Sequence, residues 1–475
     1  MTSTATSHEG SDQTDVVGDL IARGRNAMAA LENADQSRVD EAVTAVAWAI
    51  YAPERARELA ELAVRDTGLG NVADKVTKNQ RKTFGALRDL MRVKTVGVIE
   101  EDLERGIVKY AKPVGVVAAV TPSTNPAATP ANKTMMALKG RNAVIIAPSP
   151  AGYNTTLRTV EFMRSALQRI GLAADLVQIL PAPVTKASTQ ALMVACDLVV
   201  VTGSQNNVRS AYRSGTPAIG VGAGNVPVII DDSADLDAAA EKIAASKTFD
   251  NATSCSSENS VVILDSIYDV ALAALGKAGG YLADNEQKQN IARCLWVDGD
   301  LNRDLIATDF DVLAAATELG ESAHGSQFAM VEEQGIGADF PFSGEKLSLV
   351  LSVYRARDFD DALSITQRLL DFQGSGHSCG IHTADMEHAR RVAEQIDVVR
   401  VLVNQAHTFG NGGGFNNGLN FTLSMGCGTW AGNSISENLN YRHFINITHL
   451  STVIAEDEPT EQQLFGDFHS KYGRN

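Results

Sequence analysis

The sequence predicts an α/β fold in which parallel sheets are covered by helices on both faces. Two observations predict it. Short apolar runs recur after about residue 106 with helical stretches between most of them, and the alternation restarts after about residue 250. Strand, helix and strand at this spacing form βαβ units, whose strands are buried on both faces and therefore apolar throughout. A chain of 475 residues is long enough for two or three domains and a large core.

The N-terminal part of the chain is predicted to be helical. Residues 1–15 are polar and acidic, and we expect them to form a disordered tail. Beyond them, apolar residues recur at helical spacing as far as residue 94. Pro53 suits the first turn of a helix, and Gly68 suits a helix end. The expected helices are Val16–Leu31, Ser37–Tyr51 and Pro53–Thr67.

Two series of strands follow. Residues 408–418 are rich in Gly and Asn, and we expect them to form a loop whose backbone approaches another group closely. The first series comprises strands at Val114–Val120, Ala143–Ala147, Leu176–Leu180, Leu198–Val201 and Val228–Ile230, with helices at Ala131–Lys139, Tyr153–Arg169 and Thr185–Ala195. The second comprises strands at Val261–Leu264, Leu347–Val353 and Val399–Val403, with helices at Tyr268–Gly276 and Asp358–Phe372.

Composition and charge exclude several classes of protein. Lys and Arg number 41 against 57 Asp and Glu, which gives a net charge of −16. Without a basic tract, the chain is a poor nucleic-acid binder. The longest clean apolar run, Val114–Val120, is too short to span a membrane, and the N-terminus carries no secretion signal. Five cysteines without C-x-x-C spacing argue against a disulfide framework or a metal site, so we expect a cytoplasmic protein.

Two glycine-containing turns are candidate nucleotide contacts. Gly203 and Ser204 end a strand-like run, and Ser204 is a good N-cap for the helix that follows. The N-terminus of that helix would suit a pyrophosphate, and a plain βα turn is the alternative. Gly220–Gly224 lies between two strand-like runs and opens no helix, so it differs from the usual dinucleotide fingerprint. A tight turn is the simpler interpretation of that segment.

Three side chains are candidates for chemistry. Cys255 lies among Asn, Thr and Ser before a strand, where a thiol can be solvated and ionise, although free cysteines are more often small buried hydrophobic residues. His377 suits a general base or a hydrogen-bond donor, with a structural role as the alternative. Asn125 lies in a loop held by two prolines, which would preorganise its amide to bind an oxyanion; the alternative is an Asn-Pro turn.

Seven blocks of sequence occur in one order: TPSTNP, RNAVIIAPSP, SGTPAIGVGAGNVPVIID, SKTFDNATSCSSENSVVILD, GEKLSLVLSVYRARDF, GHSC and SMGCGTWAGNSISEN. Together they resemble the CoA-acylating branch of the aldehyde dehydrogenase superfamily, which includes the acylating acetaldehyde and sulfoacetaldehyde dehydrogenases. The resemblance runs from about residue 16 to about residue 455. Within it, Asn404–Asn420 is more similar to the sulfoacetaldehyde type.

The resemblance implies an enzyme that oxidises a short aldehyde to an acyl-CoA, or catalyses the reverse, with NAD or NADP and coenzyme A. Sulfoacetaldehyde and acetaldehyde are the substrates it suggests. By position, Cys255 would be the nucleophile, and the Asn125 amide and the Cys255 backbone N–H would hold the oxyanion. His377 would act near the CoA thiol. CoA would remove the acyl group from a Cys255 thioester in a ping-pong sequence.

The resemblance also implies contacts to the nicotinamide cofactor. Glu345 matches the family's ligand to the nicotinamide ribose, and Gly203 and Ser204 match the turn beside the pyrophosphate. Pro148 and Ser149 lie where the adenosine ribose would rest, and the family's usual Lys near Ser149 is absent, so NAD and NADP both stay open. The expected cofactor contacts are Thr121, Pro122, Pro148, Ser149, Gly203, Ser204, Gly222 and Glu345, and no metal is expected.

A missing carboxylate separates the candidate reactions. Hydrolytic aldehyde dehydrogenases have a Glu in the block that corresponds to Gly220–Pro227, where it activates water. Here Val221 stands in that place, and Pro217–Val228 contains no acid. The sequence therefore favours CoA over water as the acyl acceptor. The alternatives are a hydrolytic aldehyde dehydrogenase, a catalytically silent CoA-binding scaffold, and a cysteine hydrolase using Cys255 and His377.

The family's fold implies three parts: a cofactor-binding domain (16–105 and 113–248, with 421–440 returning to it), a catalytic domain (249–420) and oligomerisation arms (106–112 and 441–456). We therefore expect a Rossmann-type parallel sheet, a second α/β domain, and a homodimer or homotetramer. The expected partners are a small aldehyde and CoA, not nucleic acid or a membrane. If the substrate carries a sulfonate, His407–Asn420 is predicted to supply polar contacts to it.

Overall fold

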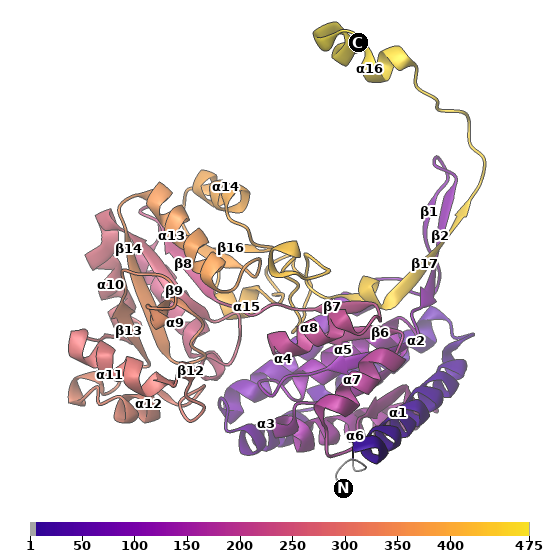
Figure 1. The fold of residues 1–475 in the computed structure, drawn as a ribbon, viewed down its shortest axis with the longest axis horizontal. Coiled ribbons are helices and arrows are strands. Elements are labelled where there is room, and N and C mark those ends of the chain that lie inside the picture. The colour runs from indigo at the N-terminus through magenta and orange to yellow at the C-terminus, as the bar shows by residue number, and fades with distance from the viewer. Residues whose placement is uncertain (1–5, 475) are drawn as a thin grey trace.

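Two parallel sheets covered by helices and one projecting antiparallel sheet make up the molecule (Figure 1). The structure is a computed structural model, and it describes residues 6–474. Every strand pair in the two larger sheets is parallel, which confirms the predicted α/β class. Among the described residues, no helix is both long and apolar enough to cross a membrane.

Four helices form the N-terminal part: α1 (Thr6–Met28), α2 (Gln36–Tyr51), α3 (Pro53–Thr67) and α4 (Val72–Met91). Helix α3 has the predicted bounds, with Pro53 in its first turn and Gly68 in a left-handed conformation after its end. Helix α1 begins at Thr6, so residues 6–15 are helical and the expected disordered tail is wrong there. Residues 1–5 of that tail lie outside the described residues. Once Val17 and Leu20 are buried, each residue added toward the N-terminus adds a backbone hydrogen bond.

The first parallel sheet has the strand order β5-β4-β3-β6-β7. Its strands are β3 (Val116–Val120), β4 (Ala143–Ala147), β5 (Val177–Ile179), β6 (Leu198–Val201) and β7 (Ala218–Gly220), and its helices are α5 (Ala128–Lys139), α6 (Tyr153–Arg169), α7 (Lys186–Ala195) and α8 (Gln205–Arg213). The chain proceeds from β3 to β5 on one side and then crosses to β6 on the other. The carboxyl ends of β3 and β6 therefore form the topological switch point at which such sheets bind ligands.

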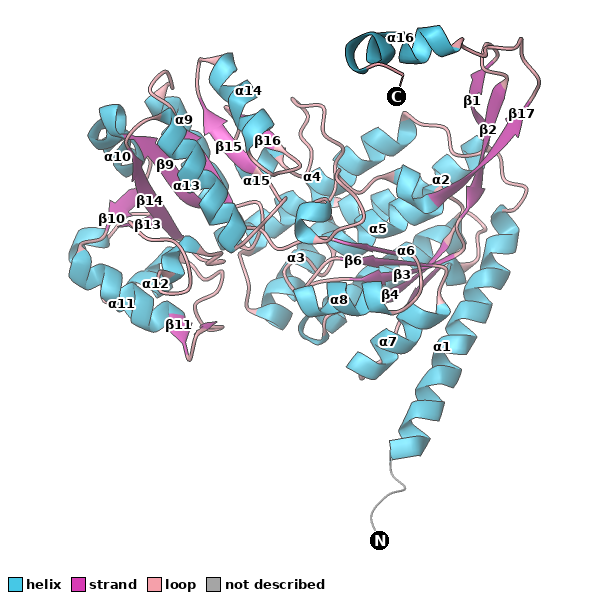
Figure 2. Cartoon of the chain, turned by 45° about the horizontal axis from the view of Figure 1, so that its top comes forward, coloured by secondary structure: helices cyan, strands magenta, loops and turns pink. Residues whose placement is uncertain are grey.

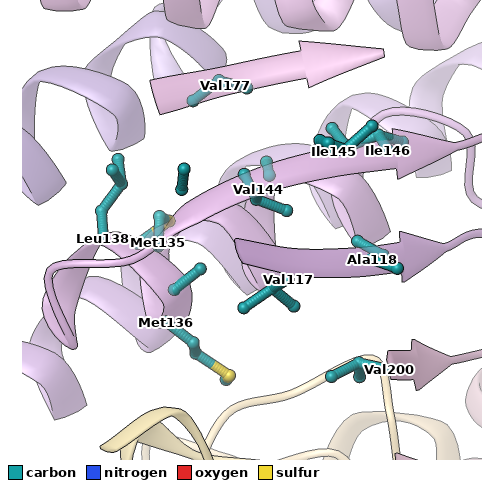
Figure 3. Packing of buried hydrophobic residues seen from close by; sticks show 14 of the residues in the cluster. Val117, Ala118, Met135, Met136, Leu138, Val144, Ile145, Ile146, Val177 and Val200 are labelled. Atoms are coloured by element: carbon teal, nitrogen blue, oxygen red, sulfur yellow. The ribbon is translucent and has the colours of Figure 1, made fainter. Parts of the chain in front are cut away.

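Apolar side chains fill the space between this sheet and its helices. Met135 and Leu138 of α5 belong to the same buried cluster as Val117 of β3 and Val144 of β4 (Figure 3). Burying such a side chain fully contributes roughly 1.5–3 kcal/mol. The core is therefore a rigid support for the loops at the carboxyl edge of the sheet.

The second parallel sheet has the order β10-β13-β14-β9-β8-β15-β16. Its strands are β8 (Val226–Ile230), β9 (Glu258–Leu264), β10 (Gly280–Leu282), β13 (Phe328–Glu332), β14 (Val350–Ala356), β15 (Cys379–His382) and β16 (Val401–Val403). Its helices are α9 (Leu236–Thr248), α10 (Tyr268–Lys277), α11 (Asn285–Leu295), α12 (Phe310–Ala316), α13 (Phe359–Phe372), α14 (Met386–Gln395) and α15 (His407–Gly410), and β11 (Trp296–Val297) pairs with β12 (Asp300–Leu301).

Strand β8 corrects the expected domain boundary. The sequence analysis placed residues 113–248 in the first domain, but β8 pairs with β9 and β15 of the second sheet. The first sheet ends at Gly220, so the chain passes between the sheets through residues 221–225. The apolar run in β8 has the same composition as the runs before it, and only its pairing shows which sheet it joins.

The last part of the chain returns to the first sheet and then leaves the body. Phe421 and Leu439 lie in the first core. Strand β17 (Ile445–Ser451) pairs with β2 (Ile107–Pro113), which pairs with β1 (Gly97–Asp102), so the projecting sheet includes a strand that the expected arm of 106–112 omits. Helix α16 (Glu461–Tyr472) follows an extended segment and lies apart from both parallel sheets (Figure 2).

Candidate active site

A cavity of about 950 Å³ opens at the carboxyl edge of the first sheet, at the switch point between β3 and β6. Loops that follow three neighbouring strands form its walls, because the carboxyl ends of parallel strands meet at one edge. The lining includes six of the eight expected cofactor contacts: Thr121, Pro122, Pro148, Ser149, Gly203 and Ser204.

The charge and backbone of this cavity suit a phosphate-rich ligand. Ser204 Oγ accepts a hydrogen bond from the Asn207 backbone N–H at 3.4 Å, so the predicted N-cap of α8 is confirmed. Lys186, Arg209 and Arg213 also line the cavity. No Asp or Glu occurs among the described residues of the lining. Cations and helix N-termini both favour bound phosphate groups.

The other two expected cofactor contacts, Gly222 and Glu345, lie outside this lining. A Cβ on Gly222 would lie 2.9 Å from the sulfur of Cys427, so close packing alone requires the glycine. Glu345 lies in the loop before β14. Burial raises the pKa of Glu345 to about 7, although Lys346 and Lys247 lower it. Glu345 is near enough to Cys255 to raise the pKa of its thiol.

Cys255 lies in the turn before β9, at the amino-terminal end of this central strand of the second sheet. Its side chain is partly exposed. Burial raises the pKa of Cys255 to about 12, and Glu345 acts in the same direction while Arg400 lowers it. The thiol is therefore protonated at neutral pH. The expectation that polar neighbours would let it ionise is wrong, because Thr253, Ser256 and Ser257 are themselves buried.

A strained turn precedes Cys255 and is held in place from α4. Asp250, Asn251 and Ala252 have left-handed φ angles of 50°, 52° and 61°. This conformation costs about 1–2 kcal/mol per residue. The Asp250 carboxylate offsets that cost by accepting hydrogen bonds from Lys78 and, at 3.1 Å, from Lys75. Helix α4 therefore fixes the turn that presents Cys255.

Asn125 faces a second, smaller pocket together with Ser254 and Ser256, which flank Cys255 in the chain. Its Nδ2 donates to Thr124 Oγ1 at 3.3 Å, and its Oδ1 is buried without a partner in the described part of the chain. The fold thus brings Asn125, after β3 of the first sheet, to the turn that carries Cys255, before β9 of the second.

His377 is buried at the start of β15, and its Nδ1 lies 2.8 Å from Ser378 Oγ. Burial, Arg400 and His407 lower the pKa of His377 well below its usual value, so its imidazole is neutral. No group in the described residues 6–474 partners its Nε2. That nitrogen is buried, and His377 lines neither of the two cavities described above.

Arg400 was not among the predicted site residues, although it contacts several segments of the site. Its guanidinium donates to Asn411 Oδ1 at 2.8 Å, to the Gly426 carbonyl at 2.9 Å, to Asn438 Oδ1 at 3.2 Å and to the His377 carbonyl at 2.7 Å. It is 4% exposed. Its neighbours in sequence give no indication of this role, since it simply precedes an apolar strand.

A basic face on α4 is a second feature that was not among the predicted site residues. Lys78, Arg81 and Lys82 line the pocket beside Asn125. Their spacing of i, i+3 and i+4 places them on one face of a helix, and that spacing was visible in the sequence KVTKNQRK.

The anion contacts expected from His407–Asn420 stay a prediction for the segment, and His407 and Asn411 are not placed to make them. His407 and Asn411 are buried, and their side chains bind protein groups: His407 Nε2 lies 2.9 Å from Ser378 Oγ, and Asn411 Nδ2 donates to Ser256 Oγ at 2.9 Å. Neither lines the pocket, to which this segment contributes only Thr408, Phe409 and Gly412.

Comparison with known proteins shows the family of the chain. The model of the aldehyde dehydrogenase family matches residues 3–284. The acylating sulfoacetaldehyde dehydrogenase of Cupriavidus necator is 53% identical over 97% of this chain and 94% of its own length. That of Bilophila wadsworthia is 42% identical over 96% of this chain and 99% of its own. The crystal structure of an acetylating aldehyde dehydrogenase from Geobacillus thermoglucosidasius superposes with a TM-score of 0.91 at 34% identity, covering 96% of this chain and all of that one. The chain therefore belongs to the acylating branch of the aldehyde dehydrogenase family, in which oxidation of an aldehyde is coupled to formation of an acyl-CoA.

Proposed function

We propose that this enzyme oxidises sulfoacetaldehyde, with NADP and coenzyme A, to sulfoacetyl-CoA. The identity of 53% to a sulfoacetaldehyde dehydrogenase across nearly the whole of both chains carries the choice of substrate. A small pocket beside Asn125 and the Cys255 turn, lined by basic side chains, is consistent with an anionic aldehyde.

In the proposed reaction, Cys255 bears the acyl group. Its thiol first loses its proton to solvent, and the resulting thiolate adds to the aldehyde carbon, which forms a C–S bond and converts the carbonyl oxygen into an oxyanion. The Asn125 amide and the Cys255 backbone N–H hold that oxyanion. The lining of the cavity beyond β3 and β6 would hold the nicotinamide cofactor, which would supply the hydride acceptor. Cys255 then carries a thioester, and it leaves as a thiolate when the sulfur of CoA bonds to the acyl carbon.

CoA rather than water receives the acyl group, because the water-activating Glu of the hydrolytic relatives has no counterpart here. Val221 is 5% exposed and stands where hydrolytic relatives have a Glu, and Pro217–Val228 contains no acid. We assign His377 to the CoA thiol. Its imidazole is neutral and its Nε2 has no partner among the described residues, so it would accept the thiol proton when CoA is bound beside it.

The function is tested by mixing the purified enzyme with sulfoacetaldehyde and NADP, with and without CoA, and following the absorbance of the reduced nicotinamide. We expect at most one equivalent of reduction per site without CoA and continuous reduction with it. Continuous reduction without CoA would identify a hydrolytic enzyme. No reduction with sulfoacetaldehyde or acetaldehyde would overturn the proposal.

Choice of NADP over NAD rests on the basic lining of the larger cavity. Lys186, Arg209 and Arg213 form no ion pair with any residue whose side chain is described, so they are free to meet a phosphate. Replacing Arg209 and Arg213 by Gln should lower kcat/KM for NADP roughly tenfold or more and leave kcat/KM for NAD within about twofold. Steady-state kinetics with both cofactors measure this. A rise in KM for CoA alone would instead assign the two cations to a CoA phosphate.

A further inference from the structure

The small pocket beside the Cys255 turn has a basic wall and no acidic one. Lys78, Arg81 and Lys82 of α4 line it together with Asn125, the two serines that flank Cys255, and the rings of Phe249 and Phe409. No Asp or Glu is among the described residues that line it. The whole chain has a net charge of −16, so the positive charge at this pocket is a local feature that opposes the overall charge.

Two of the three cations lack a carboxylate partner. Lys78 pairs with Asp250. Arg81 and Lys82 form no ion pair with any side chain that the structure describes, Lys82 Nζ donates to the Gly412 carbonyl at 2.8 Å, and Arg81 Nε is buried without a partner. Arg81 and Lys82 are partly exposed, and a bound anion stabilises cations that are partly shielded from water and have no counter-ion.

Aromatic rings hold Arg81 in place without neutralising it. Its guanidinium lies 5.7 Å from the ring centroid of Phe409, 5.1 Å from that of Phe415 and 5.8 Å from that of Phe421. Cation–π contacts at this range orient the planar group, and its N–H donors remain available to a ligand.

The pocket is also the right size for a small anionic group. About 30 Å³ of it is open to the centres of water molecules, and one water needs roughly 10–15 Å³ on that measure. The space therefore suits two or three waters, or one tetrahedral group with three terminal oxygens.

We propose that Arg81 and Lys82 bind the sulfonate of the substrate and thereby select a short anionic aldehyde. This assignment rests on the proposed function and names the residues that determine its substrate. The sulfonate oxygens accept hydrogen bonds from the Arg81 guanidinium and the Lys82 ammonium, while the aldehyde carbon extends toward Asn125 and Cys255. Burial, Arg81 and Lys78 lower the pKa of Lys82 to about 7 in the ligand-free protein, and a bound anion keeps Lys82 protonated.

The test compares sulfoacetaldehyde with methylsulfonylacetaldehyde, a neutral sulfone in which a methyl group replaces the charged oxygen. The variants are Arg81→Met and Lys82→Met, with Arg81→Lys to restore the charge. Arg88→Met is the matched control, because Arg88 lies on the same helix over Phe415 at 5.3 Å but pairs with Asp89 and is outside the pocket lining.

We expect each Met variant to lose roughly 30- to 100-fold in kcat/KM for sulfoacetaldehyde, as for a lost charge-assisted hydrogen bond, and to stay within about threefold of wild type on the sulfone. Arg81→Lys should recover part of the loss, and Arg88→Met should change neither substrate. Equal losses on both substrates, or none on sulfoacetaldehyde, would overturn the assignment.

A competition experiment separates this assignment from the proposed function. Ethanesulfonate should inhibit wild-type oxidation of the sulfone competitively with the aldehyde, and its inhibition constant should rise at least tenfold in Arg81→Met. This result supports the anion subsite even if sulfoacetaldehyde proves to be no substrate. Absence of competitive inhibition in the wild type would overturn the subsite even if sulfoacetaldehyde is oxidised.

Discussion

Cys255→Ser should lower turnover by at least about 10³-fold, because a serine hydroxyl is a far weaker nucleophile at neutral pH and its ester resists attack by CoA. Cofactor binding should be unchanged, since Cys255 does not line the cavity beyond β3 and β6. In the wild type, substrate and oxidised cofactor without CoA should leave one acyl group on the peptide that contains Cys255. Intact-protein and peptide mass spectrometry detect it.

The pH dependence of thiol alkylation provides a second measurement on Cys255. Because its pKa is raised to about 12, the thiolate is a small fraction of the free enzyme at neutral pH. Iodoacetamide labelling of Cys255 should therefore accelerate about tenfold per pH unit between roughly pH 7 and 9, without a plateau. The other partly exposed cysteine, Cys294, is followed separately on its own peptide. A plateau near pH 8 would contradict the raised pKa of Cys255. An acyl group on a different cysteine would contradict its role as the nucleophile.

Elements with strong local determinants were predictable from the sequence. The bounds of α3, β4, α6 and β6 agree with those predicted. Pro53 begins α3 and Gly68 follows it, Gly152 precedes α6, and β4 and β6 are continuous apolar runs. The assignment of β8 to a sheet was not predictable in the same way. An apolar strand such as β8 fits any parallel sheet that is covered by helices on both faces. Which of the two sheets it joins depends on its pairing with β9 and β15, which a local pattern does not encode.

The cofactor cavity was more predictable than the reacting centre for the same physical reason. Thr121, Ser149 and Gly203 each follow a strand of one parallel sheet, so the topology alone brings them together. The environment of Cys255 combines α4, the turn at Asp250 and the strand edge at Arg400, which lie far apart in the sequence. The pKa of the thiol depends on that packing, and local composition therefore gave the wrong direction.

The basic face of α4 is an intermediate case. The spacing of Lys78, Arg81 and Lys82 already placed their side chains on one helical face. What the sequence did not contain was the identity of their neighbours: Asp250 neutralises Lys78, and no acid within residues 6–474 pairs with Arg81. The same spacing of cationic residues occurs on a solvated helix face and at an anion subsite. The two are distinguished by whether the side chains line a pocket.

Arg400→Met should lower the free energy of unfolding and also slow the reactions of the Cys255 thiol. The first effect comes from lost hydrogen bonds and the second from the lost positive charge. Its four hydrogen bonds join the start of β15, the Gly-rich loop and the segment that returns to the first sheet. Hydrogen bonds to a charged group contribute about 1.5–3 kcal/mol each. Removing a buried guanidinium returns several kcal/mol of desolvation cost. The free energy of unfolding should therefore fall by about 2–4 kcal/mol, measurable as a lower urea midpoint.

The electrostatic effect of Arg400 is separable from its structural one. Because Arg400 lowers the pKa of Cys255, its loss should raise that pKa further and slow iodoacetamide labelling at fixed pH. Arg400→Lys keeps the charge but loses the planar fork that reaches four acceptors. We expect Arg400→Lys to label near the wild-type rate while its urea midpoint stays low. If Arg400→Met labels as fast as the wild type, the guanidinium stabilises the loops around the thiol and does not tune the thiol itself.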